Sequence, residues 1–62
     1  MEVLFIEDEN VKQRSIVSYL KKDLGIKNVS VAQSLMGGIL ALKNTEFKMV
    51  LLDMSLPLYD VN

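Results

Sequence analysis

The chain has 62 residues, half of them apolar, and contains neither cysteine nor histidine. Seven basic and eight acidic side chains give a net charge of −1, and the basic residues are scattered along the sequence. The length and the apolar content favour one small folded domain of low stability. The scattered basic residues form no positively charged patch of the kind that binds nucleic acid or an anionic membrane. The missing residue types exclude disulfides, thiolate or imidazole metal ligands, and Ser-His or Cys-His nucleophiles.

The first predicted element is a β-strand at residues 3–6, with the sequence VLFI. A short, wholly apolar and β-branched-rich segment is typical of a strand buried on both faces, as in a parallel sheet covered by helices. The segment is only four residues long and has acidic residues on both sides, so we expect neither a signal peptide nor a membrane span. We therefore expect a cytoplasmic protein.

An amphipathic helix is predicted next, over residues 10–25. Ile16, Leu20 and Leu24 recur at four-residue spacing and form its apolar face, whereas the lysine and arginine side chains occupy the other faces. Gly25 is the expected C-terminal stop, because glycine readily adopts the left-handed conformation in which many helices end.

A more alternating segment, residues 29–32 (VSVA), predicts a second strand nearer the edge of the sheet. A second helix should follow, with Ser34 as its N-cap. Its expected buried stripe consists of Leu35, Ile39 and Leu42. The two adjacent glycines inside it weaken a helix by roughly 1 kcal/mol each relative to alanine. They indicate close packing against a neighbour, mobility, or only the ordinary cost of glycine in a short helix.

The last predicted strand, residues 49–52 (MVLL), repeats the apolar pattern of the first and completes an alternation of strands and helices. Such an alternation predicts a three-layer α/β domain with a parallel sheet and right-handed crossovers. The two helices can cover opposite faces only if the first strand lies in the middle, which gives the strand order 2-1-3. This order places a topological switch point, where open parallel sheets bind ligands, between the carboxyl ends of the first and third strands.

Acidic residues follow both of these strands. Glu7, Asp8 and Glu9 come after the first strand, and Asp53 comes after the third. Crowded carboxylates repel one another unless a cation neutralises them, and Mg²⁺ is bound by one or two carboxylates together with water and phosphate oxygens. The alternative is a solvated acidic rim. This alternative applies most to Glu9, which falls in the first helical turn, where the helix dipole favours acidic side chains.

The segments VLFIEDE and MVLLDMSLP resemble the receiver domain of two-component response regulators. In that family an acidic pair ends the first strand, the phosphoacceptor aspartate ends the third, and a proline follows four residues later, as Pro57 follows Asp53. The resemblance implies a flavodoxin-like fold, of which residues 1–62 form the N-terminal half: a partial receiver domain with the order strand, helix, strand, helix, strand.

The resemblance also implies a role for each matching residue. Asp8 would bind Mg²⁺ directly, and Glu7 would reach the metal through water. Asp53 would be the phosphoacceptor, and Ser55 would offer its backbone carbonyl to the metal. The implied function is two-component phosphorelay signal transduction, in which this phosphoprotein is a signalling domain and not a turnover enzyme. The implied partner is a sensor histidine kinase or a phosphotransfer protein.

The chain also departs from the family pattern. The fourth and fifth strands of a receiver, which carry a Ser or Thr and a Lys of the site, have no counterpart here, and Val61 stands where the family often has glycine, after Asp60. We therefore expect a truncated or cleaved receiver, or a half-domain completed by something else.

Two further hypotheses belong to other functional classes. The first is a non-phosphorylated protein–protein interaction module, whose apolar third strand is a docking edge. That edge would pair with the missing C-terminal half, or antiparallel with the third strand of a second copy in a two-fold dimer. The second is a hydrolase with an aspartyl nucleophile. Such an enzyme would usually have another acid two residues after Asp53, where this chain has Ser55.

Overall fold

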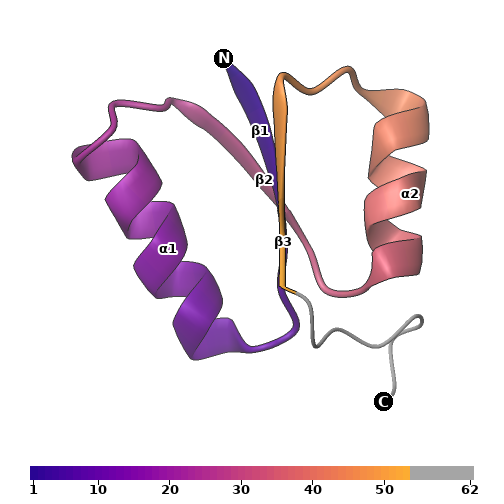
Figure 1. The fold of residues 1–62 in the computed structure, drawn as a ribbon, viewed down its shortest axis with the longest axis horizontal. Helices are drawn as coiled ribbons and strands as arrows, with labels where there is room; N and C mark the ends of the chain where they lie inside the picture. Colours follow the sequence, from indigo (N-terminus) through magenta and orange to yellow (C-terminus); the bar gives the residue numbers. More distant parts are fainter. Residues whose placement is uncertain (54–62) are drawn as a thin grey trace.

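Three parallel strands form a single sheet with one helix on each face in the computed structural model, which describes residues 1–53 (Figure 1). The elements along the chain are β1 (Glu2–Ile6), α1 (Asn10–Lys22), β2 (Asn28–Ala32), α2 (Leu35–Asn44) and β3 (Met49–Leu52). The strand order is β2-β1-β3, and both neighbouring pairs are parallel. The predicted order 2-1-3 is therefore confirmed, and the layout is that of the first half of a flavodoxin-like fold.

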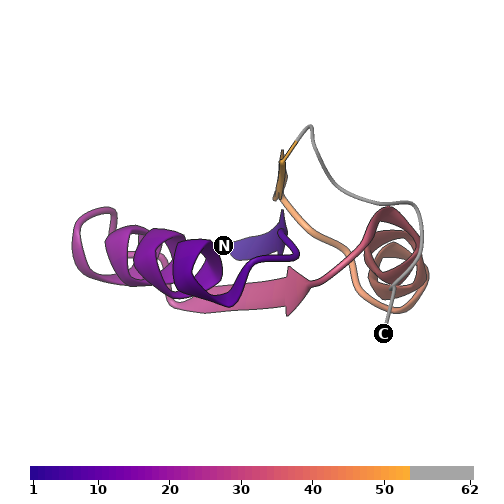
Figure 2. The same ribbon diagram turned by 90° about the horizontal axis from the view of Figure 1, so that it is seen from below.

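The register of the strands decides which side chains share a face of the sheet. Phe5 lies opposite Val31 on β2 and Leu51 on β3, so these residues point to one face. The residues beside them in sequence, such as Ile6, point to the other face. Gly38 of α2 lies against Ile6, which identifies the face that α2 covers, and α1 covers the opposite face (Figure 2).

The side chains of β1 supply most of the buried core, whereas those of β3 are only partly covered. The four apolar residues of β1, from Val3 to Ile6, are between 0% and 6% exposed. On β3, by contrast, Val50 is 42% exposed and Leu52 is 45% exposed. The prediction that both strands are buried on both faces is thus confirmed for β1 and wrong for β3. The reason is that α2 packs mainly on β2 and β1, which leaves its face of β3 without cover.

Helix α1 buries a narrower face than its apolar spacing predicts. Leu20 is buried, but Ile16 and Leu24 are exposed. Leu24 is exposed because the helix ends at Lys22, so this residue lies beyond the last turn. Gly25 does adopt the expected left-handed conformation, with φ of 70°, but it does so three residues after the end of the helix and not directly at it.

Helix α2 begins as predicted, because the hydroxyl of Ser34 accepts a hydrogen bond of 3.0 Å from the backbone N–H of Gly37. Its buried residue is Gly38, whereas Ile39 and Leu42 of the predicted stripe are exposed. A side chain at position 38 would collide with Ile6, so the glycine permits a close approach of α2 to β1. Of the three explanations for the glycine pair, close packing is confirmed at Gly38.

None of the helices within residues 1–53 combines the length and the apolar character that crossing a membrane requires.

Candidate functional site

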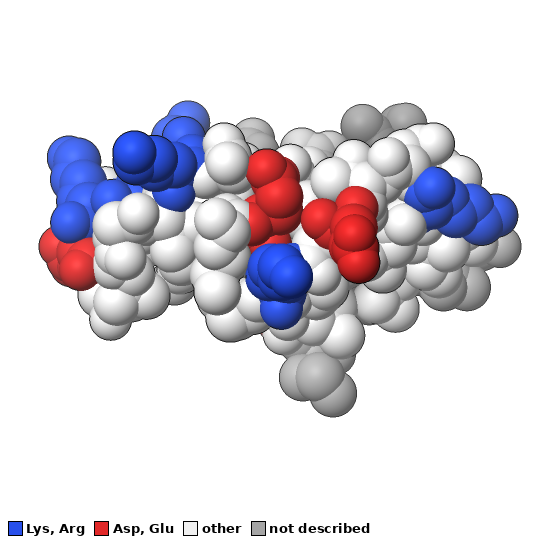
Figure 3. All heavy atoms as spheres, turned by 90° about the horizontal axis from the view of Figure 1, so that it is seen from above, with Lys and Arg blue, Asp and Glu red and all other residues white. Residues whose placement is uncertain are grey.

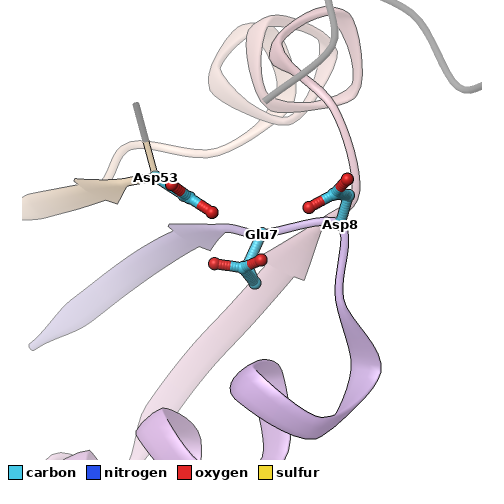
Figure 4. Close-up of side chains that lie close together, drawn as sticks. All are labelled: Glu7, Asp8 and Asp53. Atoms are coloured by element: carbon cyan, nitrogen blue, oxygen red, sulfur yellow. The ribbon is translucent and has the colours of Figure 1, made fainter. Parts of the chain in front are cut away.

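Three carboxylates meet at the carboxyl edge of the sheet (Figure 4). Glu7 and Asp8 follow β1, and Asp53 follows β3, so the parallel pairing of these strands brings the acids to the same edge. One oxygen of each side chain lies within 4.8 Å of those of the other two. The carboxylates of Asp8 and Asp53 point toward each other across the end of β1.

Backbone hydrogen bonds hold the two strand ends in place beyond the last paired residues. The N–H of Asp53 donates to the carbonyl of Ile6 over 3.2 Å, and the N–H of Glu7 donates to the carbonyl of Ala32 over 2.9 Å. The sheet ladder thus continues into Glu7 and Asp53, whose backbone positions are set by the strands beside them. Asp8 lies in the bend between β1 and α1.

The three acids differ in burial. Glu7 is only 3% exposed, Asp8 is exposed, and the side chain of Asp53 is 20% exposed. Burial raises the pKa of Glu7 above its ordinary value of 4.5, and a hydrogen bond and the negative charge of Asp53 raise it further. A hydrogen bond of 3.1 Å from the N–H of Glu9 to Oε2 of Glu7 and the positive charge of Lys12 act in the opposite direction.

Helix α1 contributes two polar side chains to the site. The Gln13 amide donates a hydrogen bond to the backbone carbonyl of Glu7. The Nζ atom of Lys12 lies 3.9 Å from Oδ2 of Asp53 and 3.9 Å from Oε1 of Glu9. From the sequence, Lys12 was expected only on a polar face of the helix, and its place at the site was missed. The available signal was its position in the first turn after the acids, three residues from Glu9.

The site opens onto a hollow of about 520 Å³ between α1 and the sheet. Apolar side chains of β1, α1 and β3 line this hollow, among them Phe5, Ile16 and Leu51. Glu7 and Asp53 are among its polar lining residues. The acidic cluster therefore borders an open apolar surface on the α1 face of the sheet.

The opposite edge of the sheet has a different character. Figure 3 looks onto the amino-terminal ends of the strands, where acidic and basic side chains lie next to one another. Basic side chains gather at the α1 end of this face, and acidic and basic side chains adjoin near its middle. The carboxyl edge therefore stands out by its group of three acids.

The donor set suits a hard divalent cation. Carboxylate oxygens are the protein ligands that Mg²⁺ prefers, and its octahedral shell usually keeps several waters. Glu7, Asp8 and Asp53 could each offer an oxygen to one ion, and a cation there would relieve the repulsion among them. Glu9 is not part of the cluster. It is exposed and is the N-cap residue of α1, although its side chain accepts no capping hydrogen bond and its carboxylate lies near Lys12.

Three positions on which the resemblance relies lie outside the described residues. They are Ser55, which would offer a backbone carbonyl to the metal, Pro57 and Asp60. The structure thus brings together Glu7, Asp8 and Asp53, and the expected contribution of Ser55 stays a prediction.

Comparison with known proteins shows a similarity to one curated protein of unknown role over most of the chain. The chain is 30% identical over 59 residues to the uncharacterized protein y4jR of Sinorhizobium fredii. The match covers 95% of this chain and 39% of the relative, so the chain spans well under half of that protein's length. No family model matches the chain. No solved structure matches it either.

Proposed function

We propose that the chain is the N-terminal part of a receiver-type phosphoacceptor domain, in which Asp53 accepts a phosphoryl group at a site that binds Mg²⁺. The observation that carries this proposal is the meeting of three carboxylates, with oxygens within 4.8 Å of one another, at the carboxyl ends of adjacent parallel strands. The strand order 2-1-3 makes this edge the switch point, where ligands bind in open parallel sheets.

The proposed reaction is a single displacement. A carboxylate oxygen of Asp53 forms a bond to phosphorus, and the bond from phosphorus to a donor imidazole nitrogen breaks. The imidazole leaves with the electron pair, and the product is an acyl phosphate. Bound Mg²⁺ would offset the repulsion between the carboxylate nucleophile and the anionic phosphoryl group.

The remaining steps are assigned to the chain's own residues. Asp8 is exposed and could bind the ion from the solvent side, whereas Glu7 is buried beneath it and could act through water. The backbone hydrogen bond from Asp53 to Ile6 fixes the direction of the nucleophile's main chain. We assign the backbone carbonyl of Ser55 as a further metal ligand on the basis of the resemblance.

The proposed setting is a cytoplasmic phosphorelay. The phosphoryl donor would be a sensor histidine kinase or a phosphotransfer protein, and the chain would be a signalling domain and not a turnover enzyme. Neither nucleic acid nor a membrane is part of the proposal, since the basic residues are scattered along the sequence.

Phosphorylation itself tests the proposal. The chain is incubated with acetyl phosphate in the presence and absence of Mg²⁺, and its intact mass is measured. We expect low-occupancy, Mg²⁺-dependent addition of one phosphoryl group, which hydroxylamine removes and which Asp53→Asn abolishes. Occupancy should stay low in a test of residues 1–62, because the Ser or Thr and the Lys of a receiver site belong to strands that this range does not include. A label that persists in Asp53→Asn would contradict the assignment of the nucleophile.

A second candidate function, a protein–protein interaction module, is favoured by the exposure of Val50 and Leu52. Within the described residues β3 pairs only with β1, so its other edge offers backbone groups to a further strand. The occupant would be the C-terminal half of a receiver domain or, in a two-fold dimer, the antiparallel β3 of a second copy. Sedimentation of the chain at micromolar concentration tests the dimer. A folded monomer of 7.0 kDa would contradict it.

A further inference from the structure

We infer that Lys12 is a tethered cation that competes with a divalent metal ion for the candidate site, so that metal binding displaces its ammonium group from Asp53. The inference rests on the proposed function, because it concerns the regulation of the same site. It assigns a role to a helix residue that lies outside the three carboxylates.

The position of Lys12 is fixed by the start of α1. The helix begins at Asn10, two residues after Asp8, and its buried Leu20 anchors it on the sheet. The hydrogen bond from the Gln13 amide to the backbone carbonyl of Glu7 ties the first turn to the end of β1. The base of the Lys12 side chain is therefore held beside the acidic cluster, and only its flexible stem decides where the ammonium group lies.

The ammonium group of Lys12 lies between two carboxylates. Its Nζ atom lies 3.9 Å from Oδ2 of Asp53 and equally far from Oε1 of Glu9. The Lys12 side chain is 59% exposed and that of Asp53 is 20% exposed. A pair with one partner largely in solvent and 3.9 Å between its charged atoms is weak and easily broken. When an ion takes the oxygens of Asp53, Lys12 can stay beside Glu9, which lies outside the three-carboxylate cluster. After displacement, Asp53 would be paired with the metal ion and Lys12 with Glu9.

The sign of the effect follows from the charges. A unit positive charge next to Asp53 repels a divalent cation that approaches the same oxygens, so removal of that charge should strengthen metal binding. At the distances observed and with strong solvent screening, we expect the dissociation constant for Mg²⁺ to fall by roughly threefold to tenfold. The effect should shrink at high ionic strength, because salt screens exposed charges.

Three variants of the 62-residue chain test the inference. Lys12→Met removes the charge and keeps most of the apolar stem, and Lys12→Arg keeps the charge. Lys21→Met makes the same change in net charge in the last turn of α1, away from the site. Each is titrated with MgCl₂ at one fixed pH, while the backbone amides of Asp8 and Asp53 are followed by NMR. Circular dichroism checks that each variant is folded.

Tighter binding by Lys12→Met, with Lys12→Arg and Lys21→Met close to the wild-type chain, would support the inference. Equal affinity in all four proteins would overturn it and leave the proposed function standing, as would weaker binding by Lys12→Met. A change shared by Lys12→Met and Lys12→Arg would also overturn it, because the charge would not be the cause. Absence of Mg²⁺ binding in every protein would contradict the proposed function, and the inference with it.

Discussion

Strands β1 and β3 have similar apolar sequences but very different surroundings. The four apolar residues of β1 are at most 6% exposed, whereas Val50 and Leu52 of β3 are more than 40% exposed. The helices account for the difference, because α1 packs mainly on β2 and α2 packs mainly on β2 and β1 (Figure 2). In the candidate site, Glu7 therefore follows the best buried strand of the sheet, and Asp53 follows a strand at its margin.

Strand β1 therefore has two roles, because it supplies most of the core and also positions an acid of the candidate site. Burial of β1 supplies most of the core, and the same burial places the carboxyl group of Glu7 where water is scarce. Strand β3 contributes less to the core, and the proposed nucleophile, Asp53, directly follows it. Substitutions of apolar residues should therefore reduce the stability of the chain more in β1 than in β3.

The largest expected difference in the free energy of unfolding is that between Leu4→Ala and Leu52→Ala. Leu4 has no exposed surface, so its truncation should lower the free energy of unfolding by about 2–5 kcal/mol, which is enough to unfold much of a domain of this size. Leu52→Ala, at a side chain that is 45% exposed, should cost about 1 kcal/mol or less. Urea unfolding followed by circular dichroism measures both. Equal losses of stability in the two variants would contradict the unequal burial of β1 and β3.

A smaller effect is expected where α2 meets β1. A Cβ atom at position 38 would lie 3.0 Å from Cγ1 of Ile6 and closer still to Cδ1, so Gly38→Ala should destabilise the chain by about 1–3 kcal/mol despite the better helix propensity of alanine. Combination with Ile6→Val, which removes Cδ1, should recover part of this loss. The matched control is Gly37→Ala, whose Cβ would meet Ser34 Oγ at 3.3 Å and Ala32 Cβ at 3.7 Å. If both glycine substitutions cost the same, the close contact at Gly38 is not the cause.

The smallest expected effect is a change in the pH dependence of stability. Because the pKa of Glu7 is raised in the folded chain, the fold favours its protonated form. The resulting stabilisation is present below the ordinary pKa of 4.5 and is lost as the pH rises through the higher folded value. Glu7→Gln should remove this loss, so in metal-free buffer its stability should fall less over that pH range than that of the wild-type chain. The exposed Glu9→Gln serves as the control, and an identical pH profile for Glu7→Gln and the wild-type chain would contradict the burial argument.

The order of elements was predictable from the sequence, because the alternation of apolar segments and helical periodicity leaves few parallel arrangements. The strand order 2-1-3 followed from the need to cover both faces of the sheet, and the cap at Ser34 followed from its position before an apolar run. These features depend on local pattern and on chain connectivity, which a sequence displays directly.

The packing of the helices was not predictable to the same degree. Apolar spacing indicated Ile39 and Leu42 as buried, but α2 approaches the sheet through Gly38, a residue with no hydrophobicity of its own. The burial of β3 depends on which strands the helices cover, and its own sequence does not contain this information. Lys12 was missed for a related reason, since its distance to Asp53 depends on how α1 lies against the sheet.

The candidate site was predicted in part. The pattern of acids after the first and third strands anticipated that Glu7, Asp8 and Asp53 would lie together, because parallel strands end at one edge. The separate behaviour of Glu9 also followed from its place at the start of the helix. Repulsion among the crowded carboxylates was expected, and Asp53 does raise the pKa of Glu7. Burial, the largest cause of the raised pKa, was not predicted, because it depends on how the chain packs.

The most direct test of the account is a residue-resolved Mg²⁺ titration of the wild-type chain, Asp8→Ala and Glu9→Ala. If the three carboxylates form one metal site, the amide signals of residues 7, 8 and 53 should shift together with a single dissociation constant in the wild-type chain. Asp8→Ala should abolish these shifts, and Glu9→Ala should retain them, since Glu9 lies outside the cluster. Equal behaviour of the two variants, or no saturable shift at these residues in the wild-type chain, would contradict the account.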